Sequence, residues 1–283
     1  MIKANYTIFK FYLTSMDFFS GYLSRKYTEN SLESTDHYRT IIIQKIVRMF
    51  HTLEMLMNES HDGVSARCVL RGILDNVATY CFIYQRDDEN EVMFRHYLYA
   101  LDGFRTYKRN VVDGIVEKGD DGQQCENICN EIIRKLEYKL VSHPYSKLGN
   151  INVEKIIHNA NWRYESLQKP RSLKYGMIYK QMGFNSNMAN YYQKYLPQFT
   201  HGLCISNFPV NDMKQITAVL YESIPLADKF IQAIHETFHE KEMIMHFRCS
   251  KNIREFIDSK DFKHEDLAEF ARALIRKDKT LLI

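Results

Sequence analysis

The sequence contains few of the residues that tight turns require. It has 11 glycines and 5 prolines among 283 residues, whereas all-β folds draw heavily on both for their turns. Dinucleotide-binding α/β folds need glycine-rich loops, and the chain has neither a GxGxxG nor a Walker-type stretch. Apolar residues instead recur at helical spacing along most of the chain. The sequence therefore predicts an all-α, multi-helix, bundle-like protein.

The apolar spacing also indicates where the helices lie. We expect helices over 3–27, 36–60, 64–85, 90–116, 123–141, 171–182, 187–204, 212–247 and 264–277. The segment 212–247 has the clearest pattern, a 4-3-4-3-4 spacing typical of a bundle seam, formed by Leu220, Ile224, Ala227, Ile231, Ile234 and Phe238. The polar stretch 142–170 contains several turn-forming pairs. We therefore expect a single helical domain over 1–283 with a loop-rich insertion or hinge at 142–170.

The apolar residues do not form export or membrane segments. No segment has the ~18 consecutive apolar residues that a membrane-spanning helix needs. Polar residues interrupt the first twenty positions, and no small-residue cleavage site follows them. We therefore expect a cytoplasmic protein with no membrane partner, whose six cysteines are reduced.

Positive charge is concentrated in the middle of the chain. Residues 131–200 contain eleven Lys or Arg and four Glu, a balance of 11 − 4 = +7, although the whole chain carries only +3. Aromatic residues are interleaved with these cations. Cations neutralise phosphates and aromatic rings stack on unpaired bases, so this mixture is typical of proteins that bind RNA or other single-stranded nucleic acid. The candidate nucleic-acid- or phosphate-binding residues are Arg163, Lys169, Arg171, Lys174, Tyr175, Tyr179, Lys180, Tyr192 and Lys194.

A structural interpretation of the same residues stays open. The aromatic side chains would then belong to the core and the lysines to a solvated face. Tyrosine occurs 19 times in the chain, so its presence near cations is only weakly specific. Under this interpretation the protein is a helical scaffold whose partners are other proteins.

Two arginines on the predicted helix 64–85 form a second candidate site. Arg67 and Arg71 lie beside its main apolar face, and Asp75 follows Arg71 at the spacing of a helical ion pair. Buried cations need partners, which are either structural carboxylates or an anionic ligand. His201 near the end of helix 187–204 is either a helix cap or a proton-transfer residue. Arg67, Arg71, Asp75 and His201 are therefore the candidate catalytic residues of a helical ribonuclease.

The segment Ala66-Arg67-Cys68-Val69-Leu70-Arg71 leading to Asp75, followed later by a Tyr-rich helix ending in His201, resembles a broad family of uncharacterised bacterial helical proteins. The resemblance covers about residues 40–205 and implies an all-helical fold without an assigned activity. The family usually has Glu at the position of Asp75, and Ser shortly before the histidine. Related families are similar to the HEPN ribonucleases of bacterial defence, but no histidine here has an Arg four to six residues upstream, as that group requires.

Residues 235–239 read His-Glu-Thr-Phe-His, a literal HExxH motif. In zinc proteases the two histidines lie one helical turn apart and bind the metal, while the glutamate activates water. His235, Glu236 and His239 are therefore candidate residues for zinc or another divalent metal. A third ligand is required, and nothing in the sequence selects one. The alternative is a polar stripe beside the bundle seam, and no cofactor is then expected.

Three hypotheses about function follow from these patterns. The first is a binding or regulatory protein, with a role in bacterial defence, that uses the basic middle of the chain on nucleic acid or another phosphate-bearing partner. The second is an enzyme, either a helical ribonuclease or a metal-dependent hydrolase. The third is a protein-interaction scaffold.

Overall fold

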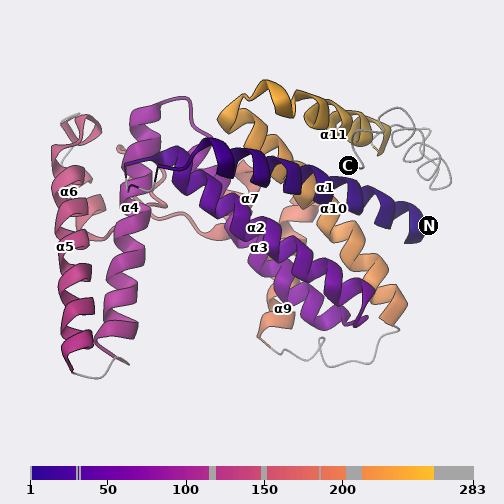
Figure 1. The fold of residues 1–283 in the computed structure, drawn as a ribbon, viewed down its shortest axis with the longest axis horizontal. Coiled ribbons are helices and arrows are strands. Elements are labelled where there is room, and N and C mark those ends of the chain that lie inside the picture. The colour runs from indigo at the N-terminus through magenta and orange to yellow at the C-terminus, as the bar shows by residue number, and fades with distance from the viewer. Residues whose placement is uncertain are drawn as a thin grey trace. The chain divides into compact units, whose positions relative to one another are not determined.

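The structure, a computed structural model, describes residues 2–29, 31, 33–114, 119–147, 152–184, 186–201 and 212–257. Within these residues the regular elements are helices and there is no β-strand, which confirms the predicted all-α class (Figure 1). None of the helices among them is both long and apolar enough to cross a membrane. The helix expected at 264–277 lies outside the described residues.

The chain divides into two compact units. Unit 1 comprises residues 1–81 and 179–283, and unit 2 comprises residues 82–178. The boundaries fall inside helix α3 (Gly63–Tyr84) and helix α7 (Tyr175–Gln181) rather than in linkers rich in glycine or proline. Composition therefore did not indicate this division, and the loop-rich stretch expected at 142–170 lies within unit 2.

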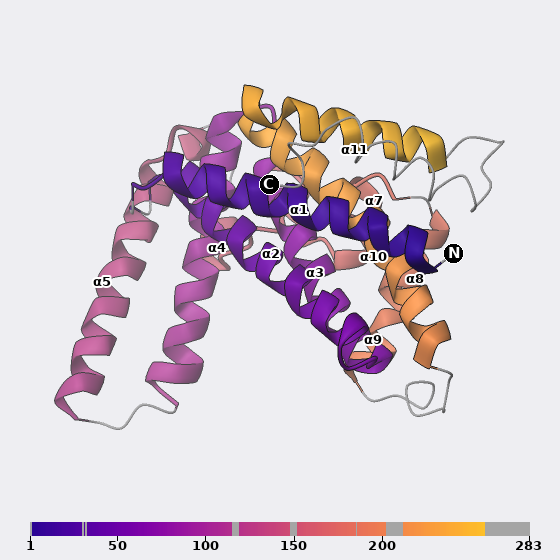
Figure 2. The ribbon, with the colours of Figure 1, turned by 45° about the vertical axis from the view of Figure 1, so that its right-hand side comes forward.

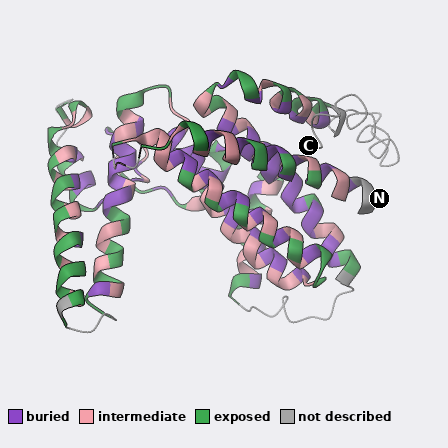
Figure 3. Ribbon diagram, in the orientation of Figure 1, coloured by how far each residue is buried: buried purple, intermediate pink, exposed green. Residues whose placement is uncertain are grey.

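Unit 1 is a helical bundle around the long helix α10. Its helices are α1 (Ile2–Lys26), α2 (Thr35–Asn58), most of α3, the end of α7, α8 (Ser186–Lys194), α9 (Leu196–Thr200), α10 (Asp212–Phe238) and α11 (Ile244–Ile257). Helix α1 packs on both α2 and α10, and α11 packs on α10 (Figure 2). The seam residues from Leu220 to Ile234 are buried, as the 4-3-4-3 spacing predicted (Figure 3).

A buried carboxylate joins three helices of unit 1. Asp228 of α10 accepts hydrogen bonds from the Tyr12 hydroxyl of α1 at 3.1 Å and from the Ser250 hydroxyl of α11 at 2.5 Å. Arg254 of α11 contacts its other oxygen at 3.3 Å, and Gln232 donates to the same oxygen at 2.6 Å. Because a buried carboxylate is stable only when it has such partners, this cluster fixes how α1 and α11 pack on α10.

Glu240 makes a second polar link in unit 1, directly after α10 ends. Lys26 reaches both of its carboxylate oxygens at 2.6 Å, and Tyr27 donates a hydrogen bond at 2.7 Å. Burial alone would raise the pKa of Glu240, but the hydrogen bonds from Lys26 and Tyr27 outweigh it and lower the pKa below its usual value. A carboxyl whose pKa is lowered on folding stabilises the fold above its unfolded pKa and stops doing so as pH falls through the folded pKa.

We therefore expect the Glu240→Gln variant to be less sensitive to acid than the wild type. Urea unfolding at about pH 7 and about pH 3 measures the free energy of unfolding on both sides of the carboxyl titration. The wild type should lose more stability between the two pH values than the variant, since the other carboxyl groups contribute equally to both proteins. Equal losses would show that Glu240 contributes nothing to acid sensitivity.

Unit 2 is built on an antiparallel pair of long helices. Helix α4 (Glu89–Tyr107) and helix α5 (Asp120–Ser142) lie side by side, and a π-helical turn, Lys108–Val112, extends α4 (Figures 1 and 2). Asp88 caps α4 by accepting a hydrogen bond from the backbone N–H of Asn90 at 2.8 Å. A 3₁₀ turn, Pro144–Lys147, and a short helix, α6 (Asn152–His158), follow α5. Helix α6 lies within the loop-rich stretch expected at 142–170 and was not among the helices expected from the sequence.

Candidate functional site

Residues 162–173 of unit 2 form a short hairpin that presents charged side chains. The backbone N–H of Leu173 donates to the Arg163 carbonyl at 2.9 Å, and that of Glu165 donates to the Arg171 carbonyl at 3.0 Å. These bonds flank an antiparallel bridge between Tyr164 and Ser172. The backbone pairing therefore holds Arg163 and Arg171 at fixed positions on neighbouring segments.

The hairpin alternates between buried and outward side chains. Trp162 and Tyr164 are buried, while Arg163 and Glu165 are partly exposed. This period of two is what extended backbone produces, because successive side chains point to opposite sides. The alternation of aromatic and charged residues at 162–165 was visible in the sequence, and it is the signal that could have predicted the hairpin.

Arg95 of α4 holds the hairpin in place by hydrogen bonds to its backbone. Its side chain is 0% exposed, and its guanidinium donates to the carbonyl oxygens of Trp162 and Tyr164, both at 3.0 Å. Glu91, one turn earlier on α4, supplies the countercharge at 2.7 Å. The guanidinium also lies 3.7 Å from the centroid of the Tyr164 ring. Because a buried cation is tolerated only with such partners, α4 and the hairpin hold each other in place.

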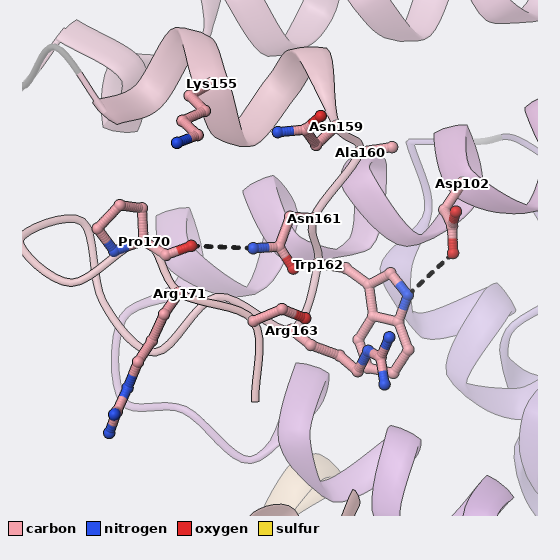
Figure 4. A pocket seen from close by; sticks show the side chains of 10 residues that line it. Asp102, Lys155, Asn159, Ala160, Asn161, Trp162, Arg163, Pro170 and Arg171 are labelled. Carbon is pink, nitrogen blue, oxygen red and sulfur yellow. Dashed lines mark hydrogen bonds between the residues drawn. The ribbon is translucent and has the colours of Figure 1, made fainter. Parts of the chain in front are cut away.

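An open pocket of about 630 Å³ lies between α4, α6 and the hairpin (Figure 4). Lys155 extends toward the pocket from α6, and Asn159 does so from the position directly after that helix. The side of the pocket nearest the hairpin is lined by Asn161, Arg163 and Arg171. Asp102 of α4 lies on the opposite side from Lys155 and accepts a hydrogen bond from the Trp162 indole N–H at 3.2 Å. The Asn161 amide donates to the Pro170 carbonyl at 3.0 Å. Cations and amide groups therefore make up five of the ten residues that line the pocket.

Two of the pocket cations have no carboxylate partner among the described residues. Lys155 is exposed, and the guanidinium carbon of Arg163 lies 5.5 Å from the Trp162 ring centroid and 5.4 Å from that of Tyr175. Arg171 differs, because its guanidinium is paired with Glu165 and its side chain points away from the other labelled groups (Figure 4). Lys155 and Arg163 are therefore the groups available to neutralise an anionic ligand.

The basic run seen in the sequence is divided between the two units. Arg163 and Arg171 line the pocket, Lys169 and Lys174 are exposed elsewhere in unit 2, and Tyr175 is partly buried. The remaining four residues belong to unit 1. Two of them are exposed cations, Lys180 and Lys194. The other two are fully buried tyrosines, Tyr179 and Tyr192, both 0% exposed.

The expectation that Tyr179 and Tyr192 stack on bases is wrong, because neither ring is accessible to a ligand. The Tyr192 hydroxyl donates to the Glu222 carbonyl at 2.7 Å inside unit 1, so this ring is part of the core. The sequence pattern also did not point to Lys155, Asn159, Asn161 or Asp102. Asp102 lies sixty residues before Trp162 in the chain, and only tertiary packing places them together.

The arginines of α3 have structural partners. Arg67 is 5% exposed, donates to Gln215 at 3.2 Å, pairs with Glu222 at 3.4 Å and covers the Phe199 ring. Its guanidinium therefore has partners on α9 and α10 without any ligand. These contacts favour the structural interpretation of this cation over a catalytic one.

Arg71 pairs with Asp75 at 3.0 Å, which confirms the ion pair expected from their spacing. The Tyr179 hydroxyl accepts from Arg71 and donates to Asp75 at 2.5 Å. Burial raises the pKa of Asp75, and the bonds from Tyr179 and Arg71 only partly oppose this effect. His201 is an exposed residue at the C-terminal cap of α9. A cap is therefore the role that its position supports.

The HExxH motif does not lie on one continuous helix. Helix α10 ends at Phe238, and His239 has a φ of 51°, a left-handed conformation typical of the residue after a helix. The His235 ring stacks on Phe247 with centroids 4.0 Å apart, and burial lowers its pKa. Among the described residues, no group of three His, Cys, Asp or Glu side chains is placed to hold a metal ion. His235, Glu236 and His239 therefore do not form a zinc-protease site within this part of the chain.

Comparison of the chain with models of known protein families, with curated proteins and with solved structures found no match. The resemblance to helical bacterial proteins therefore stays a prediction.

Proposed function

We propose that the chain binds a phosphate-bearing ligand, either free or as a unit of single-stranded nucleic acid, in the pocket of unit 2. The observation that carries the proposal is the presence in one concave site of two cations without a carboxylate partner among the described residues, Lys155 and Arg163, beside the exposed amide side chain of Asn159. Charge-assisted hydrogen bonds to phosphate oxygens are stronger than neutral ones, and guanidinium groups suit phosphate geometry.

The arrangement of Arg163 supports this assignment. Cations on the aromatic faces of Trp162 and Tyr175 are stabilised by the ring electrons without a carboxylate. A carboxylate partner would compete with phosphate for the guanidinium, as Glu165 does at Arg171. The rings therefore hold Arg163 in place while leaving its N–H donors available.

The proposal is tested by measuring how binding depends on salt. Labelled single-stranded RNA, single-stranded DNA and the common mononucleotides are titrated with the protein at about 50 and about 200 mM salt. With a slope of about −0.7 per phosphate contact, single-strand affinity should fall about 7-fold for two contacts and about 18-fold for three. Failure of every phosphate-bearing probe to bind at the lower salt concentration would refute the proposal.

A further inference from the structure

The pocket lining contains a carboxylate as well as cations, and a phosphate group would bind only the cations. Lys155 lies on one side and Asp102 on the opposite side, with Asn159 and Asn161 also in the lining (Figure 4). A carboxylate repels phosphate, so Asp102 would weaken the binding of a ligand that is anionic throughout. A ligand that is anionic at one end and carries hydrogen-bond donors at the other fits both sides.

The two carboxylate oxygens of Asp102 differ in their hydrogen-bond partners within the described part of the chain. The Trp162 indole N–H occupies Oδ2 at 3.2 Å, which orients the carboxylate. Oδ1 has no partner among the described residues, and the side chain is exposed at the pocket. An oriented carboxylate oxygen of this kind accepts a strong hydrogen bond from an N–H donor.

The amide side chains extend the same pattern. Asn159 is exposed with no partner for its side chain in the described part of the chain, and the Asn161 carboxamide oxygen is free while its nitrogen is bound to the Pro170 carbonyl. Asparagine amides form paired donor and acceptor contacts with base edges, and carboxylates accept from the amino group of cytosine. The lining therefore combines phosphate-binding cations with groups that can form hydrogen bonds to the edge of a base.

From this arrangement we infer that the pocket takes a nucleotide whose base carries an exocyclic amino group, with the phosphate at Lys155 and the amino group at Asp102. The inference rests on the proposed function and names its ligand class. Cytosine and adenine present an amino group to the free oxygen of Asp102. Uracil and hypoxanthine present a carbonyl oxygen at that position, which the carboxylate repels, and the single N–H of uracil lies between two such oxygens.

Calorimetric titration of the full chain with four mononucleotides tests this inference. We expect CMP to bind at least about fivefold more tightly than UMP, and AMP at least about fivefold more tightly than IMP. Oligo-C and oligo-U then distinguish a free nucleotide from a strand: a strand ligand binds more tightly than its mononucleotide and keeps the preference for cytosine.

The Asp102→Asn variant tests the assigned residue. Asparagine keeps an oxygen acceptor for the Trp162 indole, so the pocket should retain its shape, but its amide donates where the carboxylate accepted. The ratio of CMP to UMP affinity should fall at least about fivefold. The matched control is Glu131→Gln on α5, which removes the same charge from a side chain that is 65% exposed outside the pocket lining and should leave the ratio unchanged.

The results of these titrations distinguish a failure of the base preference from a failure of phosphate binding. Equal binding of CMP and UMP by the wild type would overturn the inference and leave phosphate binding standing. A ratio that survives Asp102→Asn, in a variant whose unfolding curve matches the wild type, would also overturn it. Binding of no nucleotide at low salt would overturn the proposed function and the inference together.

Discussion

Replacing Arg95 with methionine is expected to lower the free energy of unfolding of unit 2 by about 3–5 kcal/mol, because it removes a fully buried guanidinium together with its hydrogen bonds and its ion pair with the partly buried Glu91. Methionine fills similar space but cannot donate to the carbonyl oxygens of Trp162 and Tyr164, which Arg95 now reaches at 3.0 Å. These carbonyls would lose their partners inside the protein, and Glu91 would lose its countercharge.

Urea unfolding followed by tryptophan fluorescence measures this effect directly. Trp162 is the chain's one tryptophan, so its emission reports the unfolding of unit 2 rather than of unit 1. Arg109→Met is the control, because Arg109 is exposed and its replacement should change stability by no more than about 0.5 kcal/mol. A loss below about 1 kcal/mol for Arg95→Met would show that the hairpin does not depend on this anchor.

The second large effect is expected at Arg163. Replacing it with glutamine should weaken the binding of a nucleotide by about tenfold or more, since a hydrogen bond to a charged group contributes about 1.5–3 kcal/mol. Glutamine also loses the cation that lies on the Trp162 and Tyr175 rings. Folding should be little affected, because Arg163 has no ion-pair partner among the described residues.

Lys194→Gln is the matched control for this variant. It removes the same charge from the same basic run of the sequence, but Lys194 is an exposed residue of unit 1. Isothermal calorimetry should show unchanged nucleotide affinity for Lys194→Gln and a large loss for Arg163→Gln. Equal losses in both variants would mean that diffuse charge, and not the pocket, carries binding.

The helical framework was predictable because its signals are local. The α10 seam repeats over four turns, and each of its positions from Leu220 to Ile234 is buried. Helix α1 was expected at 3–27 and spans Ile2–Lys26. A long amphipathic helix repeats its apolar spacing many times, so the pattern is clear even without knowledge of its neighbours.

The errors occur where the signal is short or depends on tertiary contacts. Helix α6 has seven residues, about two turns, so its apolar spacing could not stand out from a loop. Helix α10 ends before His239 although no glycine follows Phe238 to mark the end, and this concealed the break in the HExxH motif.

The candidate site was only half predictable for the same reason. Arg163 and Arg171 were found because cations and aromatics cluster in that segment. Lys155 and Asp102 come from α6 and α4, and nothing local distinguishes them from other charged residues on helix surfaces. The buried positions of Tyr179 and Tyr192 show the opposite error, because composition alone does not tell a stacking surface from a core.

The most direct test of phosphate binding in this pocket is a fluorescence titration of Trp162 with CMP and with cytidine. Because this one tryptophan lies in the pocket lining, its emission changes only when the ligand affects that site or its surroundings. We expect a saturable change with CMP, no change with cytidine at the same concentrations, and a much weaker response in Arg163→Gln. No change with CMP, or the same change with cytidine, would contradict the proposal that the pocket binds phosphate.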